Sequence, residues 1–268
     1  MAEFAFSLPE QLRATRRQHK VLLAHWLQTM IWLENWRRAA RRLRYLGWAR
    51  HCPLCGSHVR LFFPHGVVPR PNAVCPVCLS RDRHRLAWLW LCEHTPILAS
   101  PLAVLHVAPE AVVARRLRAL PKVQYVSGDL VHRADIRMDV GRLPFAAGAF
   151  DLVYCSHVLN MLPDDRPALT EIFRVLHPGG LALLQVPTPL PGPGIEAGPD
   201  SSREDRRRLL GDPDMYRRYG RDDLAGRLRD VGFAARSEPY FQTFSPREQT
   251  RMGLIDEPLH LCVKPQTP

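Results

Sequence analysis

The chain has 268 residues, 46% of them apolar, which is enough to bury one large domain and a smaller one beside it. Its net charge of +11 is unevenly placed, because residues 1–100 carry 15 arginines and lysines against 5 acidic residues, whereas the rest carries 22 against 21. The longest apolar run near the N-terminus, Val21–Leu33, is too short and too polar to span a bilayer, and seven cysteines without a secretory signal favour a reducing compartment. We therefore expect a globular cytoplasmic protein, either free or peripheral to a membrane.

The first predicted domain, residues 1–50, is a basic amphipathic helical segment. Ser7 and Glu10 have the spacing of a capping box, and no Gly or Pro follows until Gly47, so one long helix or a broken pair fills roughly residues 10–46. An apolar stripe recurs along it at Leu22, Trp26, Met30, Leu33, Trp36, Ala40 and Leu43. We expect this stripe to pack on the following domain. A peripheral membrane helix or a dimer seam is the alternative, and the arginines opposite could contact nucleic acid.

The second predicted domain, residues 51–82, contains two Cys-Pro-x-Cys knuckles, formed by Cys52, Cys55, Cys75 and Cys78. Each knuckle turns two thiolates toward one centre, and two knuckles together provide the four soft ligands of a tetrahedral Zn²⁺ site. A redox pair or a disulfide framework would not explain two knuckles at this spacing. Because four cysteines leave no open position for water, we expect one structural zinc ion per chain.

The third predicted domain, residues 83–268, alternates strands with helices. Strands are predicted at 103–107, 123–126, 136–138, 152–155, 181–186 and 260–263, and helices at 83–94, 111–120, 166–176, 202–210 and 222–231. This alternation is typical of an α/β fold with a doubly wound, mostly parallel, Rossmann-like sheet. A Pro/Gly-rich loop at residues 187–200 leaves the carboxyl end of a strand, where loops commonly cover a site.

Two aspartates follow strands at the edge where a doubly wound sheet binds its ligand. Asp129 follows the second strand, where a carboxylate can accept both hydroxyls of a ribose, and Asp139 follows the third, near the place of an adenine amino group. The turn after the first strand, His106–Glu110, contains no glycine, so a backbone approach to a pyrophosphate is disfavoured. A cofactor without phosphates fits better than a dinucleotide. Taken singly, each aspartate is also an ordinary turn or cap residue.

The run from Val104 to Val186 resembles the class I S-adenosylmethionine-dependent methyltransferases. It has, in order, an acidic residue after the second strand, an Asp preceding Leu-Pro-Phe, a Phe-Asp strand and an Arg-Val-Leu-x-Pro-Gly-Gly turn. More narrowly, it is similar to a bacterial group of zinc-knuckle methyltransferases with a Leu-His-x-Ala-Pro-Glu first-strand motif, here Leu105–Glu110. A later segment of that group is matched imperfectly by Leu210–Gly220, and the resemblance covers about residues 50–235.

The resemblance implies an S-adenosyl-L-methionine site in which Asp129 holds the ribose, Asp139 lies at the adenine and the His106–Glu110 turn borders the methionine part. The implied cofactor-binding residues are His106, Ala108, Glu110, Asp129, Leu130, Asp139, Val140 and Ser156. For the chemistry, His157 follows the fourth strand and could remove a proton from an oxygen or nitrogen nucleophile, or it could only shape the pocket. Tyr219 and Arg217 could bind a hydroxylated or acidic substrate.

Three residues depart from the family pattern. Asn160 and Met161 stand where the family has Glu and His, and Met215 stands where it has His. The leading hypothesis is therefore a methyltransferase that acts on an unidentified small-molecule or glycan-type acceptor. An RNA methyltransferase, suggested by the basic front end, and a non-catalytic scaffold that retains the fold, suggested by the three departures, are the alternatives. The pattern predicts neither the acceptor nor an oligomeric state.

Overall fold

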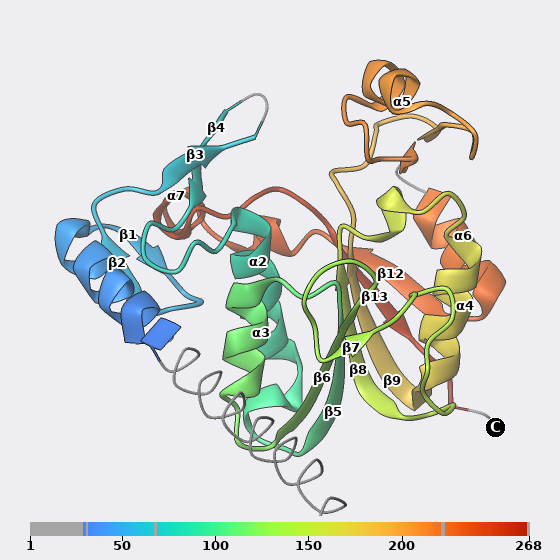
Figure 1. Ribbon diagram of the computed structural model, residues 1–268, viewed down its shortest axis with the longest axis horizontal. Coiled ribbons are helices and arrows are strands. Elements are labelled where there is room, and N and C mark those ends of the chain that lie inside the picture. The colour runs from blue at the N-terminus through green and yellow to red at the C-terminus, as the bar shows by residue number, and fades with distance from the viewer. Residues whose placement is uncertain (1–28, 31, 67–68, 221–222, 267–268) are drawn as a thin grey trace, which may run out of the picture.

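The structure of the protein is a computed structural model that describes residues 29–30, 32–66, 69–220 and 223–266 (Figure 1). The predicted N-terminal helix is present at residues 29–30 and 32–44. The remainder of that prediction, which includes Leu22 and Trp26 of the apolar stripe, lies outside the described residues.

A seven-stranded sheet forms the centre of the molecule, in the order β12-β13-β9-β8-β5-β6-β7. Its strands are β5 (Leu102–Val107), β6 (Val123–Asp129), β7 (Ile136–Arg137), β8 (Phe150–Ser156), β9 (Leu176–Gln185), β12 (Ala234–Glu238) and β13 (Leu259–Val263). Strands β9, β8, β5, β6 and β7 run parallel to one another. Strand β13 is antiparallel to both of its neighbours, β12 and β9. The predicted doubly wound, mostly parallel α/β sheet is confirmed. Its topological switch point, where such sheets bind ligands, lies between β5 and β8.

Helices cover both faces of the sheet (Figure 1). On one face lie α2 (Asp82–His94) and α3 (Ala111–Arg118), and on the other lie α4 (Arg166–Val175) and α6 (Asp223–Val231). In α4 the buried side chains recur at helical spacing, at Ala168, Leu169, Ile172 and Val175. The periodicity of apolar residues therefore located each of these helices to within two residues at both ends.

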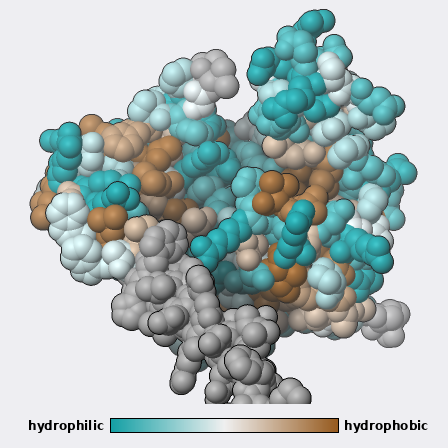
Figure 2. Space-filling view, in the orientation of Figure 1, coloured by the Kyte–Doolittle hydropathy of each residue, from teal (hydrophilic) through white to brown (hydrophobic). Residues whose placement is uncertain are grey.

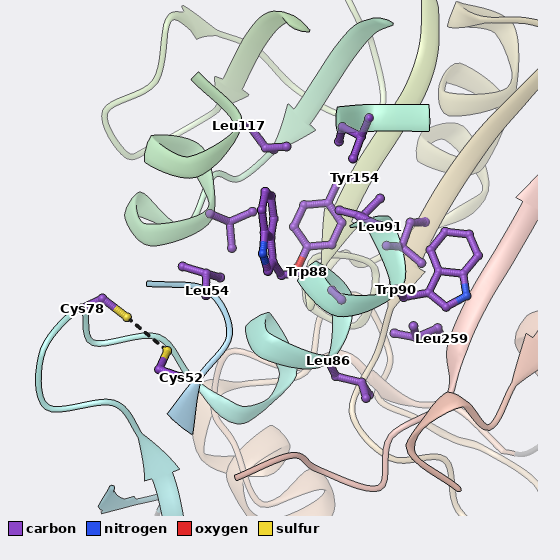
Figure 3. Close-up of a cluster of buried hydrophobic side chains, with 14 of the residues drawn as sticks. Cys52, Leu54, Cys78, Leu86, Trp88, Trp90, Leu91, Leu117, Tyr154 and Leu259 are labelled. Carbon is purple, nitrogen blue, oxygen red and sulfur yellow. Dashed lines mark hydrogen bonds between the residues drawn. The ribbon is translucent and has the colours of Figure 1, made fainter. Parts of the chain in front are cut away.

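The four cysteines are carried by two small antiparallel hairpins. These pair β1 (Leu46–Cys52) with β2 (Ser57–Val59) and β3 (Phe63–His65) with β4 (Arg70–Val74). One apolar cluster contains Cys52, Leu54, Trp88, Leu117 and Tyr154, so the hairpins share a core with α2, α3 and the sheet. Figure 3 shows Trp88 between Leu54 and Tyr154 in this cluster. Burial of these side chains against the sheet is what fixes the hairpins relative to the site.

The later elements extend beyond the sequence prediction. Strand β9 begins at Leu176, five residues earlier than predicted, because the His-Pro-Gly-Gly segment continues the strand after an irregular register between Phe150 and Leu152 of β8. The tail holds more than the one predicted strand. It also contains α7 (Pro246–Met252), which begins at a capping box of Ser245 and Glu248. The remaining short elements are η1 (Pro96–Leu98), η2 (Leu159–Met161) and η3 (Tyr240–Thr243).

In the described part of the N-terminal helix, Trp36 and Leu43 of the apolar stripe are not buried as predicted. Trp36 is 61% exposed and Leu43 is 77% exposed, whereas Glu34 and Arg38 line a cavity together with residues of α3. The expectation that the stripe packs on the following domain is therefore wrong for Trp36 and Leu43. The spacing of apolar residues defines a helix face, but here Glu34 and Arg38 line the cavity beside Met30 of the stripe, and Glu34 forms an ion pair with Arg41.

The Pro/Gly-rich loop contains a short strand, β10 (Ile195–Glu196), which pairs with β11 (Arg217–Arg218). Between them lies α5 (Arg203–Leu210), which projects from the body and forms a hydrophilic surface in Figure 2. Apolar surface is seen instead over the part that carries the N-terminal helix and β1.

Within the described ranges, the helices are too short or too polar to cross a membrane.

Candidate functional site

The four knuckle cysteines meet at one point. Their sulfur atoms all lie within 4.8 Å of one another, with Cys52 Sγ 3.7 Å from Cys78 Sγ and Cys55 Sγ 3.9 Å from Cys75 Sγ. Figure 3 shows the side chains of Cys52 and Cys78 pointing toward each other. Three of the four cysteines are buried, and Cys55 is half-buried. These are the four cysteines that the sequence predicted to converge on one point.

The two knuckles have the same backbone geometry. In the first, Gly56 N–H donates to the carbonyl of Cys52 at 2.8 Å, and in the second, Leu79 N–H donates to the carbonyl of Cys75 at 2.9 Å. Gly56 and Leu79 both have positive φ, 70° and 64°. Four thiols that converge on one point are the donor set of a soft divalent cation in tetrahedral geometry.

Asp129 is the last residue of β6, at the carboxyl edge of the sheet. Its Oδ1 accepts hydrogen bonds from the backbone N–H groups of Val131 and His132, both at 2.7 Å. Within the described residues its Oδ2 accepts no hydrogen bond, and the side chain is only 11% exposed. One oxygen therefore shapes the turn while the other stays available. Of the neighbouring predicted residues, Leu130 is exposed.

Asp139 follows β7 and closes a tight turn. Its Oδ1 accepts from the N–H of Gly141 at 2.8 Å, and its backbone forms a bridge with Arg142. The side chain is exposed, whereas that of Val140 is buried in the core. As with Asp129, one carboxylate oxygen shapes a turn.

A buried polar chain starts at the end of β5. The imidazole of His106 is fully buried, with Nδ1 3.0 Å from the Tyr125 hydroxyl and Nε2 3.0 Å from Glu110 Oε2. The other oxygen, Glu110 Oε1, lies 3.3 Å from His84 Nε2 of α2. Burial alone would raise the pKa of Glu110, but hydrogen bonds with His106 and His84 outweigh it and hold that pKa well below its usual value. The carboxylate therefore ties β5 to the first turn of α2.

Two residues at the switch point have the left-handed backbone conformation. Ala108, after β5, has φ of 49°, and His157, after β8, has φ of 57°. Non-glycine residues adopt this conformation rarely, and it costs on the order of 1 kcal/mol or more at each position. Both lie at the carboxyl ends of adjacent strands, and the N–H of His157 donates to the carbonyl of Gln185 at 2.8 Å. The fold thus holds both turns in fixed, strained positions beside each other.

His157 has a buried acidic partner. Its Nε2 lies 3.0 Å from Oε1 of Glu257, which is only 2% exposed, whereas the imidazole is 22% exposed. The hydroxyl of the adjacent Ser156 is buried and has no hydrogen-bond partner in the described part of the chain. An ionised carboxylate only accepts, so Glu257 selects the tautomer with the proton on Nε2 and leaves Nδ1 as an acceptor.

Tyr219 and Arg217 belong to a buried network at the base of the Pro/Gly-rich loop. The Tyr219 hydroxyl donates to Asp165 Oδ2 at 2.6 Å, and the guanidinium of Arg227 donates to Asp165 Oδ1 at 2.8 Å. Burial, followed by the charge of Asp165, raises the pKa of Tyr219 well above its usual value. Arg217 donates to three backbone carbonyls, those of Leu159, Leu162 and Pro163. This network anchors the loop to the turn that follows His157.

The three family departures occupy different environments. Asn160 is 1% exposed, and its side-chain oxygen lacks a hydrogen-bond partner among the described residues. Met161 is 38% exposed, and Met215 is half-buried in the loop region. The replacement at Asn160 therefore leaves a polar acceptor inside the protein next to η2, whereas Met161 places an apolar side chain at the surface.

Four residues of the edge were not found from the sequence. Arg83 and His84 come from the first turn of α2, and His84 is only 4% exposed. Gln185 accepts from the Tyr154 hydroxyl at 2.9 Å and donates to the carbonyl of Arg83 at 3.3 Å. Glu257 comes from the tail. No local pattern marks them, because each reaches the edge through the fold.

Residues 99–184 match the sequence profile of a methyltransferase domain family. A curated relative, an uncharacterised chloroplastic methyltransferase of Arabidopsis thaliana, is 44% identical over 46 residues, which are 17% of this chain and 13% of that protein. The chain thus spans only a small part of the length of that relative.

Two solved structures are similar. The 1,6-didemethyltoxoflavin N1-methyltransferase of Burkholderia thailandensis is 18% identical with a TM-score of 0.46, over 68% of this chain and 77% of that one. An S-adenosylmethionine-dependent methyltransferase from Mesorhizobium loti is 18% identical with a TM-score of 0.47, over 66% of this chain and 96% of that one. The profile match covers residues 99–184, and the strand order carries the fold assignment.

Proposed function

We propose that the protein is an S-adenosylmethionine-dependent methyltransferase whose cofactor lies across the carboxyl ends of β5, β6, β7 and β8. The observation that carries this proposal is the coincidence of the methyltransferase-domain match at residues 99–184 with the available oxygen of Asp129 at the end of β6. When bound, S-adenosylmethionine supplies an activated methyl group on a positively charged sulfur.

The residues at this edge fit a phosphate-free cofactor. Asp129 would accept hydrogen bonds from ribose hydroxyls through Oδ2, and Asp139 would lie at the adenine, bounded by Leu130 and Val140. The left-handed turn at Ala108 and the carboxylate of Glu110 would border the methionine part, with Ser156 on the adjoining strand and His106 behind Glu110. Support comes from Ser156 Oγ, which is buried at this edge and has no hydrogen-bond partner in the described part of the chain, because buried polar atoms without a partner are uncommon in native structures.

The pair of His157 and Glu257 would supply the base. Glu257 would hold the imidazole so that Nδ1 could take the proton of an O–H or N–H nucleophile of the acceptor. A small molecule or glycan-type acceptor with a hydroxyl or amine suits this arrangement. Most of the acceleration would come from alignment of the acceptor with the methyl group rather than from the base.

The cysteine cluster would hold one zinc ion as a structural element. Its four sulfurs fill a tetrahedral site, so none of its positions is left for a reacting water. Its place in the fold supports this role, because Cys78 precedes α2 by three residues and the first turn of α2 reaches Glu110. The metal would thereby fix one wall of the cofactor site.

Calorimetric titration of the zinc-loaded protein with S-adenosylmethionine and S-adenosylhomocysteine tests the proposal. We expect one site per chain, and we expect Asp129→Ala to weaken binding at least about 10-fold, the effect of losing a charge-assisted hydrogen bond. Asp200→Ala is the matched control, because Asp200 is an exposed aspartate without a recorded contact in the described residues. Equal affinities in both variants would show that the ribose is not held by Asp129. A wild-type protein that binds neither compound would refute the proposed function.

A further inference from the structure

A cavity of about 500 Å³ lies between the second cysteine knuckle, the start of α2, the start of α3 and the N-terminal helix. Its charged lining consists of Arg81, Arg83, Arg115, Glu34 and Glu110. The cavity adjoins the carboxyl edge of the sheet, because the carbonyl of Arg83 receives the hydrogen bond from Gln185 at the end of β9.

The acidic residues of this cavity already have partners. Glu110 is held by His106 and His84, and Glu34 accepts from the Arg41 guanidinium at 2.8 Å. Neither of them is therefore a free counter-charge for the lining arginines.

The arginines, in contrast, lack close carboxylates. Within the described residues, Arg81 and Arg115 have no carboxylate oxygen within 4.0 Å, and Arg83 has only Glu110 Oε1 at 3.9 Å. The Nε of Arg83 is buried and unpartnered in the same part of the chain. Burial, followed by the charge of Arg83, lowers the pKa of Arg81. Three guanidinium groups thus share a cavity without the anions that would balance them.

The proposed zinc cluster is also a negative centre, since four thiolates outweigh one Zn²⁺, but it has its own buried cation. The Arg85 guanidinium is fully buried and donates to the carbonyl of Ser80 at 2.8 Å, while the Ser80 hydroxyl lies 3.3 Å from Cys52 Sγ. The cavity arginines are therefore not required for that balance.

We propose that this cavity is an anion site, in which Arg81, Arg83 and Arg115 bind a carboxylate or phosphate group of a ligand of the methyltransferase. The proposal rests on the proposed function only for the identity of that ligand. Two sources share the chemistry: the carboxylate of the cofactor's methionine part, and an anionic group on the methyl acceptor. Arginine suits either source, because its planar fork donates two parallel hydrogen bonds to such oxygens.

Titrations of the full-length zinc-loaded protein separate the sources. If the cofactor carboxylate occupies the cavity, S-adenosylmethionine binds at least about 10-fold more tightly than its decarboxylated analogue, and inorganic phosphate competes with S-adenosylmethionine. In Arg83→Met, the two compounds then bind with equal affinity. If the acceptor supplies the anion, the two cofactors bind equally, and inorganic phosphate binds the S-adenosylhomocysteine-loaded wild type but not Arg83→Met. Arg115→Met is the second variant, because Arg115 is exposed on α3 and its loss should not disturb folding.

Arg229→Met, which removes an exposed arginine of α6, is the matched control, and zinc content is measured for every variant. The proposal is overturned if phosphate neither binds nor competes while the cavity variants bind both cofactors as the control does. It is also overturned if Arg83→Met and Arg115→Met lower the zinc content and change no binding, because the arginines would then be partners of the metal cluster. Phosphate binding that depends on Arg83 and Arg115, without any binding of S-adenosylmethionine, would support the anion site and refute the proposed function separately.

Discussion

The cysteine cluster and the carboxyl edge of the sheet are both meeting points of polar side chains, but they assemble over very different lengths of chain. The cluster comes entirely from residues 52–78 and is formed by two similar local turns. The edge joins residues as distant as His84 and Glu257, each placed there by a different helix, strand or loop. A local turn determines its geometry from a few neighbouring residues, whereas the edge depends on the packing of the whole sheet.

The difference between the two regions predicts how they fail. Loss of one cluster ligand should release a module that depends on its metal, because the hairpins are short and few of their residues form a core of their own. Loss of one edge residue should change a single contact and leave the rest of the sheet in place. The predictions below test this contrast from the largest expected effect to the smallest.

Removal of the metal should have the largest effect. We expect Cys75→Ser, or treatment of the wild type with a chelator, to lower the free energy of unfolding by at least about 3 kcal/mol, since structural zinc contributes about 10–16 kcal/mol of apparent binding free energy in zinc-finger peptides. Urea denaturation measures the change. Cys92→Ser, at a half-buried cysteine of α2 outside the cluster, is the control and should cost about 1 kcal/mol. Identical stability with and without chelator would show that the cluster does not depend on a metal.

Asp165 should have the next largest effect. It is fully buried and faces Arg217, Arg227 and the hydroxyl of Tyr219. Asp165→Ala would leave the 3% exposed Arg217 with Glu196, 3.4 Å from its Nε, as its remaining carboxylate among the described residues. We expect a loss of about 3–5 kcal/mol in the same denaturation experiment.

Tyr219→Phe, which removes only one hydrogen bond of that network, should cost about 1 kcal/mol. This variant also examines the predicted catalytic role of Tyr219. Unchanged stability together with abolished methyl transfer would assign the hydroxyl to the chemistry rather than to the anchoring of the loop.

Replacement of Glu110 should have the smallest effect, and that effect should appear as a change in how stability depends on pH. Because hydrogen bonds with His106 and His84 outweigh burial and hold the pKa of Glu110 below its usual value of 4.5, its contribution to stability is present above that pH and is lost as the pH falls toward the lowered pKa. Wild-type stability should therefore fall more steeply below pH 4.5 than that of Glu110→Gln. Parallel stability curves for the two proteins would contradict this.

Much of the fold could be predicted because its signals are local. The period of apolar residues located α2, α3, α4 and α6, and the cysteine spacing located the cluster. Strand β9 was predicted too short, since backbone hydrogen bonds with Lys264 hold Gly179 and Gly180 in the strand against their low strand propensity. The direction in which the N-terminal helix turns Trp36 and Leu43 was predicted wrongly, because a periodic stripe does not specify what will cover it.

The site divides in the same way. Asp129 and Asp139 could be proposed because each directly follows a strand, where the topology of a doubly wound sheet gives a residue its place. Glu257 could not, since it follows α7 in a segment without regular structure and meets His157 only after β13 has joined the sheet. Arg83 and His84 follow the second knuckle, and their approach to Glu110 depends on how the cysteine hairpins pack on the sheet.

A crystal structure of the zinc-loaded protein with S-adenosylhomocysteine would test the central claim, that the carboxyl edge is the cofactor site, most directly. We predict the ribose hydroxyls within hydrogen-bond distance of Asp129 Oδ2, the adenine beside Asp139 and the sulfur on the side of the edge that carries His157. Density for the compound anywhere other than the ends of β5, β6 and β8 would contradict the claim.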